Sequence, residues 1–396
     1  MKIAQVNVYF SPFTVGGAEW YVHNISKRLV KMGHEVHVYT ADKYSGRRAP
    51  REEVIDGIFV HRIPLRLDLS YRAKMWKGLG EAISKEKFDF IHTYDYAQPH
   101  SKIALDVAKR EGIPSAVTVF DVHSMIPRPF YKQIPIKAFE KFYAGGVLNS
   151  ADRILVRAPM LIEPLVKMGA KESKIIVTPS GINEQSLGEF DGKNFLEKYK
   201  IQGRPVILFL GRLNPLKGPQ HILAVAPKIL EKFPDASFVF VGPDQSDYKR
   251  QLLVKAESAN LKDHLYFTGP IYDFKEKMEA YASCDVFVLP TTYEGTSQAI
   301  FEAMSQGKPI VSTNTGGIPS QITSGEEGLL IPYGDDEALA KSILQILGDS
   351  KEAARLGGNA REKVRSYTYP ILASKIEEIY LAALGKQHEN AIPPLG

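Results

Sequence analysis

Short apolar runs alternate with helical patterns along the whole chain of 396 residues. A short apolar run rich in Val, Ile and Phe is typical of a buried strand, and apolar residues three or four apart indicate an amphipathic helix. Such alternation predicts an α/β fold with two parallel sheets covered by helices. The predicted strands lie near 3–9, 35–40, 58–63, 88–92, 115–119, 153–156 and 174–177, then near 205–210, 236–241, 264–268, 285–289, 309–312 and 328–331.

The two sets of strands predict two Rossmann-like domains, a number that fits the length of the chain. The first covers residues 1–183 and the second residues 203–365. After Asp335 the pattern remains helical to about Leu384.

Composition is that of an ordinary globular protein, with 44% hydrophobic and 24% charged residues. The single cysteine, Cys284, cannot form an internal disulfide, and we expect an inert thiol in an apolar strand. The first residues lack the cleavage pattern of a signal peptide, and no apolar run approaches the roughly 18 residues that span a bilayer. We therefore expect a cytoplasmic protein.

Positive charge is concentrated in the first half of the chain. Residues 1–183 hold 27 Lys and Arg against 18 Asp and Glu, a net charge of +9, whereas the remainder has a net charge of −4. This asymmetry favours an anionic partner on the first domain, such as a membrane surface or a polyanionic glycan. Residues 127–141 mix cations with aromatic residues, as interfacial segments do, without forming a clean amphipathic helix. We expect no nucleic-acid partner.

Two glutamates, Glu294 and Glu302, stand eight residues apart in a segment that reads as strand, loop, helix and strand. Glu294 falls in the loop at the carboxyl end of a strand, where ligands bind in open α/β sheets, and Glu302 falls about two turns into the helix. A helix start suits a phosphate, and the N–H groups of Ser297 and Gln298 lie there. A deeper carboxylate can accept hydrogen bonds from neighbouring hydroxyls. A sugar nucleotide carries both features.

A second loop, after the strand near 205–210, carries Arg212 and Lys217. Two cations there can neutralise a diphosphate that departs with negative charge. The chain contains no Asp-x-Asp pair, which is one common way to hold a divalent metal against a nucleotide diphosphate. We therefore expect neither a metal nor a cofactor.

The loop after the first strand contains Gly16 and Gly17 just before an amphipathic helix. Glycines at a helix start let the backbone approach a ligand closely. The chain has no Gly-x-Gly-x-x-Gly sequence, so the dinucleotide fingerprint is absent.

Taken together, these segments resemble glycosyltransferase family 4, the retaining GT-B enzymes that transfer a sugar from a nucleotide sugar. The likeness runs from Met1 to about Tyr380 and includes Thr315-Gly-Gly-Ile-Pro and Gly328-Leu-Leu-Ile-Pro. It implies GT-B architecture and a metal-independent hexosyltransferase, with the acceptor on the first domain and the donor on the second. It also implies that a last helix, about 366–387, crosses back to the first domain.

The resemblance also implies roles for the residues singled out above. Glu302 would accept from the donor ribose, and Glu294 would contact the sugar. Arg212 and Lys217 would stabilise the leaving phosphate. Retention without a carboxylate nucleophile is usually described as a same-face substitution, in which the departing phosphate helps to deprotonate the acceptor.

The chain departs from the family pattern after the strand near 115–119. Phe120 stands where the family commonly has a histidine, and Asp121-Val-His123 follows. Either His123 takes over that role or the role passes to Asp121. Asp95, after another strand, is a further candidate for contact with the acceptor, which can be a glycan, a lipid or a small molecule.

Two other functions fit the same architecture. A GT-B sugar-nucleotide 2-epimerase would also bind a nucleotide sugar in its second domain. A non-catalytic sugar-nucleotide-binding protein would explain Phe120. The Arg212 and Lys217 loop, together with the glutamate spacing, favours the transferase.

Overall fold

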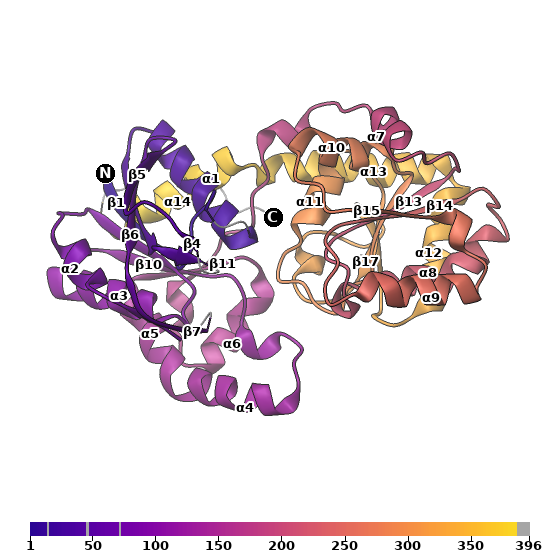
Figure 1. Ribbon diagram of the computed structural model, residues 1–396. Coiled ribbons are helices and arrows are strands. Elements are labelled where there is room, and N and C mark those ends of the chain that lie inside the picture. The colour runs from indigo at the N-terminus through magenta and orange to yellow at the C-terminus, as the bar shows by residue number, and fades with distance from the viewer. Residues whose placement is uncertain (14–15, 45–46, 71–72, 386–396) are drawn as a thin grey trace. The chain divides into compact units, whose positions relative to one another are not determined.

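The computed structural model describes residues 1–13, 16–44, 47–70 and 73–385, and its contacts divide the chain into two compact units (Figure 1). The first unit comprises Met1–Gly181 together with Tyr369–Gly396, and the second comprises Ile182–Thr368. Residues 184–202, which the sequence left outside both predicted domains, fall in the second unit, where α7 (Gly192–Lys198) buries Phe195.

The first unit is built on an eight-stranded sheet that is parallel except for one antiparallel edge strand, β5. All seven strands predicted in this half are present. The sheet order is β12 (Ile175–Val177), β11 (Arg153–Val156), β10 (Ser115–Val119), β9 (Phe90–Tyr94), β1 (Lys2–Val6), β2 (Glu35–Ala41), β6 (Ile58–Ile63) and β5 (Glu52–Ile55).

Two small hairpins and β5 were not predicted from the sequence. The hairpins pair β3 (Lys43–Tyr44) with β4 (Arg47–Arg48), and β7 (Leu65–Ser70) with β8 (Ala73–Trp76). β5 begins with two exposed glutamates and buries none of its residues. It therefore has no apolar face that the sequence pattern could reveal.

Helices cover the sheet of the first unit. In α1, Glu19 lies in the first turn and Arg28 and Lys31 in the last, so both ends complement the helix dipole. The last helix, α14, packs beside α1, and its Tyr380 ring stacks on Phe90 with centroids 4.1 Å apart. The helices are α1 (Gly17–Lys31), α2 (Leu79–Ser84), α3 (Pro99–Glu111), η1 (His123–Met125), α4 (Phe130–Phe139), the π-helix η2 (Glu140–Ala144), α5 (Gly145–Ser150), η3 (Pro159–Leu161), α6 (Ile162–Lys167), η4 (Glu172–Lys174) and α14 (Tyr369–Ala383).

The predicted crossing helix 366–387 corresponds to α14, which begins at Tyr369 and ends at Ala383. Residues 386–387 lie outside the described residues.

The second unit has a six-stranded, fully parallel sheet, and all six of its strands were predicted. Its central strands are buried along their length, which explains their continuous apolar sequences. The sheet order is β15 (Leu265–Gly269), β14 (Ser237–Val241), β13 (Val206–Leu210), β16 (Val286–Leu289), β17 (Ile310–Thr313) and β18 (Gly328–Ile331).

The remaining helices belong to this second unit. Cys284 follows α10 (Phe274–Ser283) and precedes β16, so its predicted place in a strand is wrong. The residue is buried, and burial raises the pKa of its thiol to about 12. Among the described residues, no helix is both long and apolar enough to cross a membrane. Besides α7 the helices are η5 (Glu184–Leu187), η6 (Pro215–Lys217), α8 (Pro219–Leu230), α9 (Tyr248–Ser258), η7 (Lys262–His264), α10 (Phe274–Ser283), α11 (Gln298–Ser305), η8 (Ile318–Ser320), α12 (Asp336–Gly348), α13 (Ser350–Val364) and η9 (Arg365–Tyr367).

Candidate functional site

The strand order of the second unit reverses between β13 and β16. The chain runs from β13 outward through β14 to β15, then returns to β16 on the other side of β13 and runs outward to β18. The loops that leave the carboxyl ends of β13 and β16 therefore diverge, and a crevice at such a switch point is where open α/β sheets bind ligands. Arg212 and Lys217 follow β13, and Glu294 follows β16.

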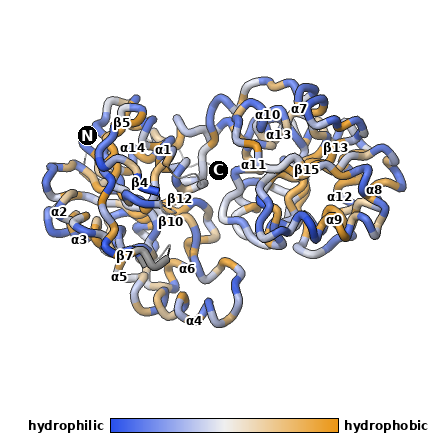
Figure 2. Tube along the Cα trace, viewed as in Figure 1, coloured by the Kyte–Doolittle hydropathy of each residue, from blue (hydrophilic) through white to orange (hydrophobic). Residues whose placement is uncertain are grey.

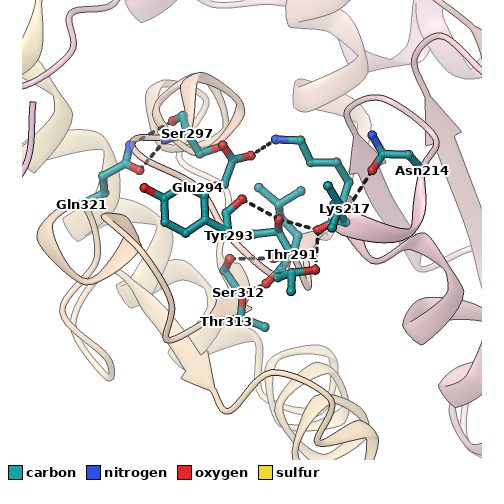
Figure 3. A network of polar contacts seen from close by, with 12 residues as sticks. Asn214, Lys217, Thr291, Tyr293, Glu294, Ser297, Ser312, Thr313 and Gln321 are labelled. Carbon is teal, nitrogen blue, oxygen red and sulfur yellow. Dashed lines mark hydrogen bonds and ion pairs between the residues drawn. The ribbon is translucent and has the colours of Figure 1, made fainter. Parts of the chain in front are cut away.

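Hydrogen bonds join these two loops. The carbonyl of Leu216 accepts from the Thr291 hydroxyl at 2.8 Å, the Thr292 N–H at 2.8 Å and the Thr292 hydroxyl at 3.0 Å. The Asn214 side chain accepts from the Lys217 N–H at 3.0 Å. The loop that carries Lys217 is thereby fixed against the loop that carries Glu294 (Figure 3).

The ammonium of Lys217 forms an ion pair with the Glu294 carboxylate (Figure 3). Both side chains are largely buried, with exposed fractions of 19% for Lys217 and 14% for Glu294. Two residues that were predicted separately therefore meet at the switch point. Arg212 is exposed and forms no hydrogen bond or ion pair with a residue that the structure describes.

The glycines of Thr315-Gly-Gly, in the loop after β17, contact the Glu294 backbone. The Gly317 N–H donates to the Glu294 carbonyl at 2.8 Å. A Cβ on Gly316 would stand 2.0 Å from that same carbonyl oxygen, and the backbone of Gly316 is left-handed with a φ of +58°. Only glycine fits there, because the loop after β17 touches the loop after β16.

Ser297 precedes α11 as its N-cap, but its N–H is already engaged. It donates to Oε1 of Gln321 at 2.7 Å, and Nε2 of Gln321 donates back to the Ser297 carbonyl at 2.9 Å (Figure 3). Gln298 is the first residue of α11. A diphosphate that used the Ser297 N–H would have to displace the Gln321 side chain, which sequence reasoning did not single out.

Glu302 lies just over one turn into α11, nearer its start than the two turns predicted. It is buried and accepts from the Lys277 ammonium at 2.6 Å and the Tyr281 hydroxyl at 3.0 Å. Both partners lie on α10, and burial together with the charge of Glu302 raises the pKa of Tyr281. The carboxylate is thus oriented by α10.

The sheet of the first unit has its own switch point, between β1 and β9. Gly16 precedes α1 with an extended backbone, and a Cβ added to it would collide with the Glu19 carboxylate. Burial raises the pKa of Glu19. A Cβ on Gly17 would meet no atom of the described part of the chain within 4 Å. At this helix start the Glu19 carboxylate therefore occupies the space beside Gly16, whereas no described residue occupies the space beside Gly17.

Asp95 and His123 are brought together at the carboxyl edge of the same sheet. Nε2 of His123 lies 3.1 Å from Oδ1 of Asp95, which also accepts the Ala97 N–H at 2.9 Å. Burial opposes ionisation of Asp95, but the hydrogen bonds that its carboxylate accepts, from His123 first and then from the Ala97 N–H, help to outweigh it, and the pKa of the carboxyl is lowered. Asp95 has a left-handed backbone with a φ of 70°, which is uncommon for a residue other than glycine.

The other ring nitrogen of His123, Nδ1, is buried and has no hydrogen-bond partner among the residues that the structure describes. If Nε2 carries the proton that binds Asp95, Nδ1 presents a lone pair. Neither ring nitrogen of His123 forms a hydrogen bond with Asp121. Asp121 is half-buried and has contacts of its own. The Asp95 contact orients the His123 ring, and the choice between His123 and Asp121 stays a prediction.

His123 lines a cavity of about 570 Å³ in the first unit. Glu140 of η2 also lines it and is buried, accepting from the Tyr96 hydroxyl at 2.7 Å and from the Ser124 N–H at 3.0 Å, so it fixes the turn that carries His123. Burial raises the pKa of Tyr96. The side-chain amide of Gln98 is a further polar group on the wall, and it is buried without a hydrogen bond to any described residue.

Phe120 lies among aromatic rings. It stacks on Tyr94 with centroids 6.0 Å apart, meets Tyr21 edge-on, and has the Arg157 guanidinium 5.4 Å from its ring centre. Arg157 follows β11, and sequence reasoning missed it. Its position directly after a predicted strand was the available signal.

We expect Gly218→Ala to lower the free energy of unfolding more than Gly334→Ala. Both glycines have a φ of +79°, so both variants carry a left-handed strain of about 1–2 kcal/mol. Only Gly218 is crowded: its Cβ would stand 1.9 Å from the Pro290 carbonyl oxygen, whereas Gly334 has nothing within 4 Å. The crowding should add about 1–3 kcal/mol. Denaturant unfolding measures both, and equal losses would contradict the close approach of the two loops.

Family models match both halves of the chain. The one described as Glycosyltransferase Family 4 matches residues 15–186, and the one described as Glycosyl transferases group 1 matches residues 192–363. An uncharacterised glycosyltransferase of Methanocaldococcus jannaschii is 27% identical over 97% of this chain and 99% of its own length. The phosphatidyl-myo-inositol mannosyltransferase of Mycolicibacterium smegmatis is 28% identical over 97% of this chain and 95% of its own length.

Solved structures share the fold over nearly the whole chain. HepE of Anabaena in complex with UDP has a TM-score of 0.78 at 18% identity, covering 96% of this chain and 100% of its own. The same protein in complex with UDP-glucose has a TM-score of 0.75. With both halves matched by these family models and the GT-B fold present, the chain belongs to the group 1 glycosyltransferases of family 4.

Proposed function

We propose that this glycosyltransferase moves a hexosyl unit from a nucleoside-diphosphate sugar to an acceptor, with retention and without a metal. The observation that carries the proposal is the largely buried Lys217–Glu294 pair at the switch point of the second unit. It places a fixed cation beside a fixed carboxylate, which suits a ligand that carries both phosphate and hydroxyl groups. HepE, solved with UDP-glucose, supports a nucleotide sugar as the donor class.

In the proposed mechanism, Lys217 and Arg212 bind the diphosphate. As the bond between the anomeric carbon and the diphosphate oxygen breaks, negative charge grows on that oxygen, and the fixed ammonium of Lys217 stabilises it more than it stabilises the intact donor. Glu294 would accept from sugar hydroxyls on one side of Lys217. Glu302, held by Lys277 and Tyr281, would accept from the ribose.

The acceptor belongs to the first unit in this proposal, at Asp95 and His123. Nδ1 of His123 would accept a hydrogen bond from the attacking hydroxyl and thereby orient it. The hydroxyl oxygen bonds to the anomeric carbon on the face that the diphosphate leaves, and its proton passes to the departing phosphate. The anomeric configuration is retained because entry and departure share one face.

We expect a nucleoside-diphosphate sugar to stabilise the protein equally with and without a chelator. A ligand at 100 times its dissociation constant adds about 2.7 kcal/mol to the free energy of unfolding. Because Lys217 and Arg212 supply the positive charge, removal of divalent ions should leave this stabilisation nearly unchanged. Thermal unfolding with a panel of nucleotide sugars, in EDTA or in magnesium, measures it.

Two results would count against this account. Stabilisation that required magnesium or manganese would show that a metal, rather than Lys217 and Arg212, carries the diphosphate. If no nucleotide sugar in the panel stabilised the protein, the proposal that the donor is a nucleotide sugar would be wrong.

A further inference from the structure

The helix α4 carries apolar residues that it does not bury. Its sequence, Phe-Tyr-Lys-Gln-Ile-Pro-Ile-Lys-Ala-Phe, is predominantly apolar, yet none of its ten residues is buried. Hydrophobic and polar residues alternate irregularly along this helix (Figure 2), and the helix lies at the outer edge of the first unit (Figure 1). A helix within a globular unit ordinarily buries its apolar residues, so this one has an unpaired surface.

The large exposed side chains of α4 and the adjoining η2 form what we call the aromatic face. It comprises Phe130 at 79% exposure, Tyr131 at 67%, Ile134 at 55%, Phe142 at 80% and Tyr143 at 46%. Isolated exposed apolar residues are common on proteins, but five within fourteen residues are a patch. Aromatic rings with a polar edge are characteristic of surfaces that sit at a bilayer interface.

The exposed charges on this face are all positive. Lys132, Lys137 and Lys141 are exposed, and the only acidic residue of the two helices, Glu140, is buried beneath them. The Lys132 ammonium lies 5.7 Å from the Tyr131 ring centre, and that of Lys141 lies 5.3 Å from the Phe142 ring centre. Cations placed beside aromatic rings complement a surface of anionic headgroups above acyl chains.

The inner side of the same helices walls the cavity that holds His123. Pro135, Ile136 and Phe139 line it together with Glu140 and Tyr143. An acceptor with an apolar portion would meet apolar walls and, at the His123 end, polar groups. A bilayer that bound the aromatic face would therefore bring lipid molecules to this cavity.

We propose that the aromatic face docks on a bilayer containing anionic lipid, and that the acceptor is an amphipathic lipid presented there. The identity of the acceptor rests on the proposed transferase function, whereas docking does not. We choose a lipid surface as the partner because the exposed charges of the aromatic face are all positive and its aromatic rings are exposed to solvent.

The test is sedimentation of the full chain with vesicles of phosphatidylcholine alone or with 30% phosphatidylglycerol (about one lipid in three carrying charge) at low and high salt. We expect binding to the anionic vesicles that weakens as salt rises. Phe130→Ser with Phe142→Ser should weaken binding at least about tenfold, since each replaces an inserted ring. Lys132→Ala with Lys141→Ala should weaken it about 30-fold, because each lysine contributes about 1 kcal/mol.

Matched controls come from the second unit. Tyr272 is 85% exposed, and Lys341 is exposed on α12, so Tyr272→Ser and Lys341→Ala change the same residue types away from the aromatic face. Both should bind vesicles as the unaltered chain does. The thermal unfolding midpoint without ligand should be unchanged in every variant, which shows that each is folded. Stabilisation by a nucleotide sugar, measured separately, should also be unchanged and keeps the donor test apart from docking.

Docking is overturned if the unaltered chain stays in the supernatant with anionic vesicles at low salt. It is overturned equally if the variants of the aromatic face sediment as the controls do, or if neutral vesicles bind as strongly as anionic ones. If the chain docks but transfers no sugar to any vesicle lipid, the proposed docking surface stands and the proposed lipid acceptor is rejected.

Discussion

Lys217→Ala is expected to lower the turnover of sugar transfer by about 10²–10³-fold, the usual cost of removing one group that stabilises developing negative charge. Lys217 is the cation that the loop 214–217 and its hydrogen bonds to the loop after β16 hold in place. Its charge matters most when the diphosphate departs, so turnover should fall more than donor affinity. Steady-state kinetics with the donor varied separates the two effects.

The variant also leaves the Glu294 carboxylate without its partner, and this can destabilise the fold. The double variant Lys217→Ala with Glu294→Gln removes that charge, so comparing its free energy of unfolding with that of Lys217→Ala measures what the unpaired carboxylate costs the fold. Lys228→Ala is the matched control, because Lys228 pairs with Glu337 on the surface of the same unit. It should retain nearly full turnover. A Lys217→Ala variant with altered donor affinity alone would contradict the leaving-group role.

His123→Ala is expected to reduce sugar transfer by about 10²-fold or more while donor binding stays unchanged. The imidazole is fixed by Asp95 through Nε2, and Nδ1 remains for the acceptor hydroxyl. Asp95→Asn should have a smaller effect, since an amide oxygen can still accept from Nε2 but carries no charge. Comparison of transfer rates with nucleotide-sugar affinity for the same variants measures both.

The matched control is His23→Ala. His23 lies in the same unit, pairs with Asp56 at 2.9 Å, and has a side-chain exposure of 11%, the same as that of His123. It has no place in the proposed site, so it should lose stability without the selective loss of transfer. Full transfer by His123→Ala would mean that the departing phosphate alone activates the acceptor.

The sequence predicted the fold well because the signal lay in the strands themselves. Central strands of both sheets, such as β10 and β14, are buried along their length, so each appears as a short run of predominantly apolar residues. What escaped were elements without such a run: β5, with its two glutamates, and α4, whose apolar residues face outward without a clear period. Cys284 was placed in a strand because the apolar run of β16 begins only two residues after it, at Val286.

The candidate site was predicted as separate residues, and the structure supplied the pairings. Lys217 and Glu294 are 77 positions apart, and they meet because β13 and β16 are neighbours at the switch point. Asp95 and His123 meet because β9 and β10 are adjacent. Gln321 had no motif around it, and its hydrogen bonds to Ser297 depend on a tertiary contact that spacing along the chain does not encode. Arg157 had only its position directly after a predicted strand as a signal, and its contact with Phe120 is likewise tertiary.

The most direct measurement of the central claim is the release of nucleoside diphosphate from a nucleotide sugar in EDTA. The unaltered chain and Lys217→Ala are compared in the presence of phosphatidylglycerol vesicles that carry candidate lipid acceptors. The account predicts release coupled to a glycosylated acceptor with the anomeric configuration of the donor, and a loss of about 10²-fold or more in the variant. Conversion of one nucleotide sugar into its 2-epimer without a glycosylated product, or equal release by both proteins, would contradict it.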